Sequence, residues 1–405
     1  MLKRLHLLLA LFILTVNAAM AQITTSGISG KITSDGENVI GATVTATHQP
    51  SGTVYRAVTN IDGRYTIQGM RPGGPYKVDI SYIGYKDKVI KNLNLSLGET
   101  ENISCSLQED AHQLQEVVVS GKAGLAASRT GAATSMTAEQ INNMPSITHG
   151  IADVARLNPQ LTVTNSGNMS FAGVNNRYNN FMIDGAANND VFGLASSGNN
   201  GGQAGAQPVS METIEQIQVS VAPFDVRQSG FTGGAINAIT KSGTNQFHGS
   251  AYYYGYNQDL IGTKYPYLDG TGYAPKYQKQ TQYNMGVTLG GPIIKNKLFF
   301  FANYERTNKE YPNLYGVDSG NSKVNTEQAK DILTMLQNIA EKQGVNFNDY
   351  YSNQDIYTRS DKAGLKLDWN INEFNKFAIR WSLVKAEQLS GGGSASSLNS
   401  YGYSY

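Results

Sequence analysis

The sequence predicts a mainly β protein. We expect an N-terminal seven-stranded β-sandwich, a small α/β domain, and then the first about five strands of an incomplete transmembrane β-barrel. Three observations lead to this prediction. Short β-rich runs alternate with turn signals over residues 24–107. Mixed helix and strand patterns continue to about residue 245, and longer strands with strict two-residue alternation fill the remainder.

The N-terminus has the three parts of a secretory signal peptide. "MLKR" is basic, "LHLLLALFILTV" is apolar but too short to cross a bilayer comfortably, and "AMA" places small residues before a cleavage point. We therefore predict a signal peptide over residues 1–21 with cleavage after Ala21, so that the mature chain begins at Gln22. An uncleaved anchor helix is the alternative. Because no cysteine follows the cut, a bacterial lipoprotein anchor is excluded.

Composition excludes several function classes. The net charge of +1 argues against a nucleic-acid partner recruited by broad basicity. Cys105 is the single cysteine, which excludes an intramolecular disulfide and a cysteine metal cluster. The sequence has no HExxH, CxxC, P-loop or GxSxG motif, and its five histidines are scattered, so we expect no enzyme activity, no metal and no cofactor. Asp184 and Asp190 flank an Asn-rich loop, and we interpret them as solvated turn residues.

The segment 22–110 is expected to be the sandwich, because its β-rich runs are separated by turn signals such as "SDGEN" and "RPGGP". The expected strands are "ISGKIT", "ATVTATH", "TVYRAVT", "RYTIQGM", "YKVDISYIG", "VIKNLNLSL" and "ENISCSL". Asp62 and Gly63 form a turn signal. Calcium binding is the alternative there, but a single Asp without a series of ligands indicates a turn.

Residues 111–136 hold an isolated strand between flexible neighbours. The stretch "LQEVVVSG" (114–121) has the β-branched residues that favour a strand, whereas 122–136 is rich in Ala, Gly, Ser and Thr and reads as a linker. An extended segment of this kind can add to the sheet edge of a partner protein. The alternative is that it forms a last strand of the sandwich.

The segment 137–245 mixes helix and strand signals. Thr137 and Gln140 form a capping-box pattern, and Ser146 is expected to cap a helix over 147–157, which must end near Asn158 because Pro159 follows. A short capped helical turn is expected at "SMETIE". The expected strands are "QLTV", "MSFAGV", "NNFMIDG", "QIQVSVA" and "GGAINAITK".

The composition changes after residue 246, where 18 of the 24 tyrosines lie. Strands with period-2 alternation are expected at 247–256, 281–291, 297–307, 361–370 and 375–386. In the last two, the residues predicted to face lipid are Leu365, Leu367, Phe377, Ile379 and Trp381. The residues predicted to face the lumen are Lys366, Asp368 and Arg380.

The alternation by itself also fits a soluble sandwich with one wet face. Short connectors that alternate with long ones, aromatic residues near segment ends and faces without charge favour an outer-membrane barrel instead. Five strands cannot close a barrel, because bacterial barrels have at least about eight and an open edge in lipid leaves backbone groups unpaired. We therefore expect the chain to be the N-terminal part of a longer protein.

Two family resemblances rest on these motifs. Residues 22–110 resemble carboxypeptidase-regulatory-like domains, which are non-catalytic sandwiches, through Gly30, Ile40, Gly41, Ala42, Val44, Gly52, Thr59, Asp62, Gly63, Tyr65 and Ile67. The order of segments resembles a TonB-dependent outer-membrane receptor of the Oar-like branch. The stretch "LQEVVVSG" resembles the TonB box, the sequence from "MIDGAANNDVFG" to "FHGSAYYY" resembles the end of the plug domain, and "LGGPIIKNKLFFFANYER" resembles two early barrel strands.

The resemblance implies a plug domain (137–245) seated in a barrel of about 22 strands that begins at 246–405. It implies an outer-membrane location, contact with outer-membrane lipid, and import of an extracellular ligand driven by TonB with the inner-membrane energising complex. The residues that would bind TonB are Glu116, Val117, Val118, Val119 and Ser120. The ligand is not identified, and a glycan is disfavoured because the pattern of glycan importers is missing. A surface adhesion protein without transport is the alternative.

Overall fold

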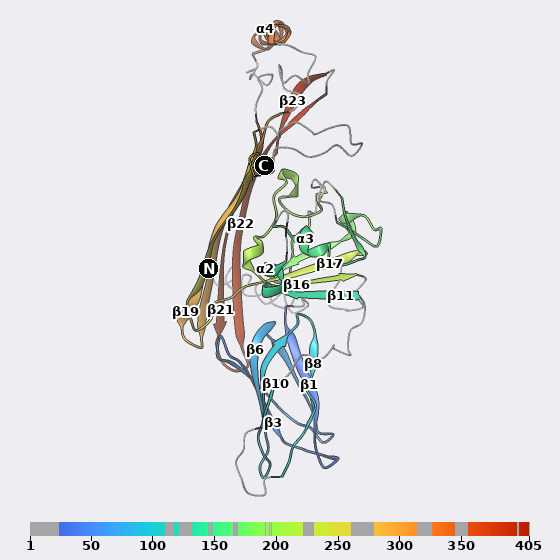
Figure 1. Cartoon of the computed structure of the whole chain (residues 1–405), viewed down its shortest axis with the longest axis vertical. Helices are drawn as coiled ribbons and strands as arrows, with labels where there is room; N and C mark the ends of the chain where they lie inside the picture. Colours follow the sequence, from blue (N-terminus) through green and yellow to red (C-terminus); the bar gives the residue numbers. More distant parts are fainter. Residues whose placement is uncertain are drawn as a thin grey trace, which may run out of the picture.

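The chain was analysed as a computed structural model. It describes residues 24–109, 117–120, 132–144, 146, 149–164, 169–190, 192–193, 195, 197–221, 231–260, 279–313, 326–344, 355–394 and 397–404. Figure 1 shows three parts: a small β-sandwich at one end, a central α/β domain above it, and a tall curved sheet whose concave side faces the central domain. The signal peptide predicted for residues 1–21 and the cleavage point lie outside the described residues.

The first sheet of the sandwich is built around β1, which has neighbours on both sides. It pairs antiparallel with β2 and β5 and parallel with β8 and β9. The predicted last strand, "ENISCSL", is split into the two short strands β8 and β9. The strands of this sheet are β1 (Ser26–Ser34), β2 (Glu37–Asn38), β5 (Arg64–Met70), β8 (Thr100–Asn102) and β9 (Cys105–Ser106).

The second sheet of the sandwich has the order β10-β7-β6-β3-β4. Its strands are β3 (Thr43–His48), β4 (Thr53–Val58), β6 (Gly73–Ser81), β7 (Lys88–Leu95) and β10 (Val117–Ser120). Alternate residues of the two sheets point inward, and Ile28, Val44, Tyr76 and Ile80 are fully buried between them. An apolar core therefore lies between the two sheets, as in the predicted sandwich.

The central domain is built on a sheet with the order β11-β16-β17-β14-β15. Its strands are β11 (Ala132–Thr137), β14 (Asn180–Ile183), β15 (Ala186–Ala187), β16 (Ile214–Val221) and β17 (Gly234–Thr240), and the hairpin β12 (Leu161–Val163) and β13 (Met169–Phe171) lies beside it. Strands β14 and β17 are buried along their whole length, as strands covered on both faces require. Residues 132–136, predicted as linker, instead form most of β11, which pairs with β16.

The helices of the central domain are short. Thr137 and Gln140 form the predicted capping box at the start of α2 (Ala138–Asn143). The prediction of a helix over 147–157 after Ser146 is wrong in its extent, because α3 spans only Ile151–Ala155. His149 has a φ of +47°, which interrupts a helix before Gly150. The 3-10 helices are η2 (Asn176–Tyr178), η3 (Gly202–Ala204) and η4 (Met211–Thr213), and η4 occupies the position of the predicted capped turn.

The tall sheet has six strands in chain order, each antiparallel to the next. They are β18 (His248–Asn257), β19 (Thr281–Ile294), β20 (Leu298–Tyr311), β21 (Ile356–Asn370), β22 (Lys376–Ser394) and β23 (Ser397–Ser404). Five strands were predicted. The sixth, β23, pairs with the end of β22 far from the sandwich (Figure 1). Helix α4 (Thr326–Lys342) lies between β20 and β21 in the sequence, at the same far end.

The two faces of this sheet differ as the alternation predicts. Leu365, Phe377, Ile379 and Trp381 are exposed on the convex face, whereas Lys366 on the other face is buried. The connectors near the sandwich are short: one links β19 to β20 and the other links β21 to β22. We call this end of the sheet the short-turn rim. No helix in the described part of the chain is both long and apolar enough to cross a membrane.

Candidate functional site

A turn of the central domain carries the first charged contact with the tall sheet. Asp184 and Gly185 join β14 to β15, and both have positive φ angles of +48° and +81°, the backbone of a type I′ hairpin that favours Asp-Gly. Thr240, at the end of neighbouring β17, donates to Asp184 through its amide at 2.9 Å and through its hydroxyl at 2.6 Å. These bonds fix the carboxylate at the domain edge.

Two cations of the tall sheet face this carboxylate. Lys366 on β21 and Arg380 on β22 are direct cross-strand partners. Lys366 Nζ lies 3.3 Å from Asp184 Oδ1, and Arg380 Nε lies 3.4 Å from Asp184 Oδ2. Lys366 also donates to the Thr240 carbonyl at 3.1 Å. The interpretation of Asp184 as a solvated turn residue is therefore wrong, because its side chain is largely buried in an ion-paired cluster.

Electrostatics favour the charged form of Asp184. Burial alone would raise the pKa of this carboxyl group, but the Lys366 ammonium, the two hydrogen bonds from Thr240 and the Arg380 guanidinium outweigh burial. The pKa of Asp184 consequently lies below its ordinary value. The carboxylate stays ionised and the contact stays attractive at neutral pH.

A second buried cluster lies along the same boundary. Lys362 Nζ on β21 is 2.6 Å from Glu305 Oε1 on β20, and both side chains are less than a tenth exposed, at 7% and 8%. The hydroxyls of Ser210, from the central domain, and Tyr252, from β18, each donate to Glu305 Oε2 at 2.6 Å. Ser210 was predicted to cap a helical turn, but it makes no such capping bond. It contacts the tall sheet instead.

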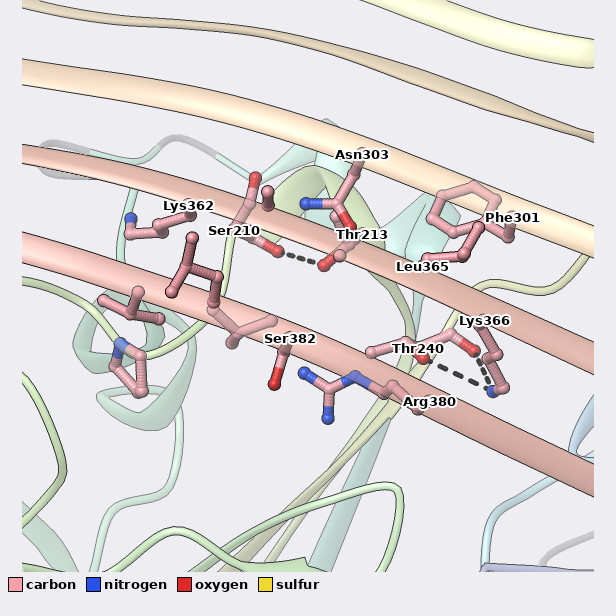
Figure 2. Close-up of a pocket in the computed structure, with 16 residues that line it drawn as sticks. Ser210, Thr213, Thr240, Phe301, Asn303, Lys362, Leu365, Lys366, Arg380 and Ser382 are labelled. Carbon is pink, nitrogen blue, oxygen red and sulfur yellow. Dashed lines mark hydrogen bonds between the residues drawn. The ribbon is translucent and has the colours of Figure 1, made fainter.

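The boundary between the two clusters is closely packed. A cavity of about 30 Å³, enough for a water molecule, is lined from both sides, by Ser210 and Thr213 of the central domain and by Lys362, Lys366 and Arg380 of the tall sheet. In Figure 2, dashed lines join Lys366 to Thr240 and Thr213 to Ser210, and Arg380 extends from the neighbouring strand. We call this boundary the seam.

A larger, aromatic cavity lies against the first strand of the tall sheet. The rings of His149 and Tyr254 are stacked with centroids 3.9 Å apart, and the Tyr254 hydroxyl donates to Glu212 at 3.2 Å. The cavity beside them, of about 390 Å³, is also lined by Gln282 and Asn284. It provides aromatic faces together with amide groups.

The seam is suited to holding two domains together. Lys362 is paired with Glu305, and Lys366 and Arg380 are paired with Asp184. Among the described residues, no group of three or more His, Cys, Asp or Glu side chains could hold a metal ion. This arrangement holds the central domain against the sheet through buried polar contacts.

The predicted TonB-binding residues lie away from the seam. Val117–Ser120 form β10, which pairs in parallel with β7 of the sandwich, with Val118 opposite Val89. Glu116 lies outside the described residues. The stretch thus forms an edge strand of the sandwich, as the alternative interpretation predicts. Whether it also binds a partner stays a prediction.

Three families match successive parts of the chain. Residues 27–108 match the carboxypeptidase regulatory-like domain, residues 126–236 match the TonB-dependent receptor plug domain, and residues 239–317 match an outer membrane beta barrel domain. The second match includes the Asp184 turn and Ser210, and the third includes Tyr252 and Glu305. The seam therefore lies between a plug domain and a barrel wall.

Two curated proteins are similar to this chain. The chain is 29% identical over 273 residues to the TonB-dependent transporter Oar of Myxococcus xanthus, a match covering 64% of this chain and 24% of that protein. It is 25% identical over 188 residues to the probable TonB-dependent siderophore receptor PirA of Acinetobacter baumannii, covering 42% and 22%. The chain spans about a quarter of the length of these relatives.

Solved structures of outer-membrane transporters are also similar. The outer membrane transporter YddB of Escherichia coli aligns with a TM-score of 0.43 at 16% identity, covering 65% of this chain and 34% of that one. The siderophore receptor PirA of Acinetobacter baumannii aligns with a TM-score of 0.39 at 18% identity, covering 67% and 43%. The family matches show a TonB-dependent receptor plug domain followed by an outer membrane beta barrel domain, and the chain is similar to two curated TonB-dependent relatives.

Proposed function

We propose that this chain serves in TonB-dependent import of an extracellular ligand across the outer membrane. One observation carries the proposal: the plug is held against the concave face of the barrel wall by Asp184 and Ser210 through buried charges. Buried ion pairs are costly to break singly. A ligand can pass such a seam only when work moves or reshapes the plug, and TonB would supply that work.

The topology supports an orientation. Outer-membrane barrels place their short turns in the periplasm and their long loops outside. With the short-turn rim on the periplasmic side, the sandwich lies in the periplasm and α4 lies outside the cell. The proposed division is a signal peptide over 1–21 cleaved after Ala21, the sandwich over 22–110, the TonB box and linker over 111–136, the plug over 137–245 and barrel strands over 246–405. Within the described residues, β18 and β23 each have one unpaired edge, so the proposed barrel needs further strands.

TonB would bind at Glu116–Ser120. Strand β10 pairs with β7 along one edge and has no partner strand along the other among the described residues. Such an edge allows a partner strand to add by main-chain hydrogen bonds. TonB, with the inner-membrane energising complex, can therefore attach either to the free edge of β10 or to the segment after it leaves β7.

The alternative is adhesion at the cell surface without transport, which the long outer segments would also serve. The two functions differ in energy dependence. Adhesion needs no seated plug and no TonB, whereas import needs both. A comparison of cells with and without TonB separates the two functions even while the ligand is unidentified.

The experiment compares the spent media of three strains of the host: wild type, a strain lacking the full-length receptor, and a strain lacking TonB. Mass spectrometry of the media identifies compounds that wild-type cells deplete. Import predicts a set of compounds that both deletion strains leave behind. If none of the compounds that wild-type cells remove remains in the media of both deletion strains, the chain is not a TonB-dependent importer.

A further inference from the structure

One hairpin of the sandwich touches the short-turn rim of the barrel wall. The hairpin comprises β3, β4 and the turn between them, and we call it the docking hairpin. Thr53 Oγ1 accepts a hydrogen bond from Asn370 Nδ2 at 2.9 Å, and the Pro50 carbonyl accepts one from the amide of Asn245 at 2.8 Å. Arg56 forms an ion pair with Glu373 at 2.6 Å. The contacts thus reach the turn between β21 and β22 and the entry to β18.

Two further contacts lie deeper at the same place. Arg71, just after β5, is 3.4 Å from Asp368 on the inner face of β21, and both side chains are mostly buried, at 25% and 13% exposure. Lys376 Nζ lies 3.3 Å from the centre of the Tyr55 ring, the geometry of a cation–π contact. Two of these three cations come from the sandwich and one from the barrel wall, and each meets an acidic side chain or an aromatic ring of the other partner.

These contacts enclose a cavity of about 380 Å³ that reaches the seam. The sandwich contributes Arg71 and Tyr55 to its lining, the plug contributes Asp184 and Thr240, and the barrel wall contributes Lys366 and Asp368. The Asp184 cluster therefore opens on this side into a space bounded by the docking hairpin. Anything that passed along this part of the seam would meet the sandwich before it reached the periplasm.

The same sandwich is tied to the plug by bonds of another kind. Gln216 on β16 accepts from the Leu97 amide at 2.5 Å and donates to the Leu95 carbonyl at 3.3 Å. Gln218 donates to the Leu97 carbonyl at 3.0 Å. All four residues are buried. These hydrogen bonds are shielded from water and salt, whereas the Arg56–Glu373 pair is more than half exposed and is screened by salt.

One sheet joins these sites. In the order β10-β7-β6-β3-β4, the docking hairpin forms one edge and β10 forms the other, while the segment after β7 carries Leu97 to the plug. A closely packed core lies beneath this sheet, so that a displacement of one edge moves the other. A force applied to β10 is therefore transmitted both to the short-turn rim and to plug strand β16.

We propose that the docking hairpin is a releasable interaction surface for the short-turn rim. Docked, it closes the seam beside β21 and β22. Released, it lets the sandwich move with the plug. The requirement that it release during import rests on the proposed function, whereas the docking and its salt sensitivity do not.

The test uses the full-length receptor in detergent with Cys105→Ser, so that no native thiol of the described chain competes. Thr53→Cys and Asn370→Cys are introduced together, because these side chains touch and disulfides accept Cα separations of about 4–7 Å. The control pairs Asn370→Cys with Glu101→Cys, which lies on the other sheet of the sandwich. Docking predicts rapid oxidation of the first pair and oxidation slower by on the order of tenfold or more in the control. Equal rates would overturn the docking.

Release of the docking hairpin from the short-turn rim is tested by raising the ionic strength and by removing one charge of the interface. Raising the ionic strength from about 0.1 M to 1 M shortens the screening length from about 10 Å to 3 Å, so cross-linking of the Thr53/Asn370 pair should slow several-fold. Arg71→Gln should slow it at low salt and reduce the effect of salt. A cross-linking rate that is indifferent to both would show a permanent joint rather than a releasable surface.

The double-cysteine receptor is then expressed in cells, oxidised there, and compared with each single-cysteine variant in the medium-depletion assay. The lock should abolish TonB-dependent depletion, while the single variants should deplete as wild type does. Continued depletion by the locked receptor would show that release is not needed. Absence of TonB-dependent depletion in the unmodified receptor would reject the proposed function, and the purified protein would still decide the docking.

Discussion

Lys362 and Glu305 form a buried ion pair at 2.6 Å between neighbouring strands of the barrel wall, and Ser210 of the plug donates to the same carboxylate. The pair is thus both a cross-strand contact and a seat for the plug. Because the lumen-facing pair is shielded from water, removing one of its two charges costs far more free energy than removing one charge of an exposed pair.

Removing one member of the buried pair should destabilise the seam. Glu305→Leu leaves the Lys362 ammonium buried without its partner, a change that costs about 3–5 kcal/mol in other buried pairs. Replacing both with Leu should recover most of that loss. The measurement is hydrogen exchange of plug strands β16 and β17 in the full-length receptor. If the double variant exchanges as fast as Glu305→Leu, the pair is not what seats the plug.

Acid should loosen the Asp184 contact. The pKa of Asp184 is lower in the folded protein than in the unfolded chain. Its contribution is therefore complete above the ordinary aspartate pKa of about 4 and is lost as the pH falls through the lower folded value. Asp184→Asn should weaken the contact between the plug and the barrel wall at neutral pH. It should also make hydrogen exchange of the plug less dependent on pH in the acid range. Acid titration of plug hydrogen exchange in both proteins tests the prediction, and parallel profiles would contradict it.

The two faces of β22 should respond differently to charge. Ile379 is 54% exposed on the convex face, and an arginine facing lipid costs up to about 2–4 kcal/mol near the bilayer midplane. Ala378, its neighbour, lies on the lumen side. Ile379→Arg should reduce the amount of folded full-length receptor in the outer membrane far more than Ala378→Arg. Equal yields of the two variants in membrane fractions would show that the faces are assigned wrongly.

The backbone of β10 should matter more than its side chains. Val118→Pro removes an N–H donor and fixes φ, so it should prevent strand pairing with TonB. Val118→Thr keeps the donor and the β-branched shape and should have little effect. The readout is the medium-depletion assay, with receptor abundance measured in parallel. A low abundance of the receptor in the Val118→Pro strain would instead indicate that this stretch is a structural strand of the sandwich. If that strain removes compounds from the medium as wild type does, this stretch does not couple to TonB.

Local patterns predicted much of this fold. Alternation fixed which side chains of β21 and β22 face outward, because a strand has a period of two whatever it packs against. The Thr137–Gln140 capping box formed as predicted, because its bonds lie within four residues. Strand β23 was missed because its sequence, "SLNSYGYS", is mostly small and polar, and its alternation is limited to Tyr401 and Tyr403.

Contacts between distant segments could not be predicted in the same way. Lys366 and Arg380 were expected to face the lumen, but their partner Asp184 lies 182 residues from Lys366 in the sequence. Its role depends on where the plug sits against the wall. An Asp-Gly pair between two strands indicates a turn, and nothing local distinguishes a solvated carboxylate from one that meets two cations. Ser210 was similarly misread, because a serine before a helical turn usually caps it.

The central claim is that Glu116–Ser120 bind TonB, and photo-crosslinking in living cells tests it most directly. A photoreactive amino acid replaces Val118 in the full-length receptor, and a second strain carries it at Glu37, an exposed position on the other sheet of the sandwich. After illumination, the account predicts a covalent adduct with TonB from position 118 and none from position 37. No adduct from position 118, or equal adducts from both positions, would contradict it.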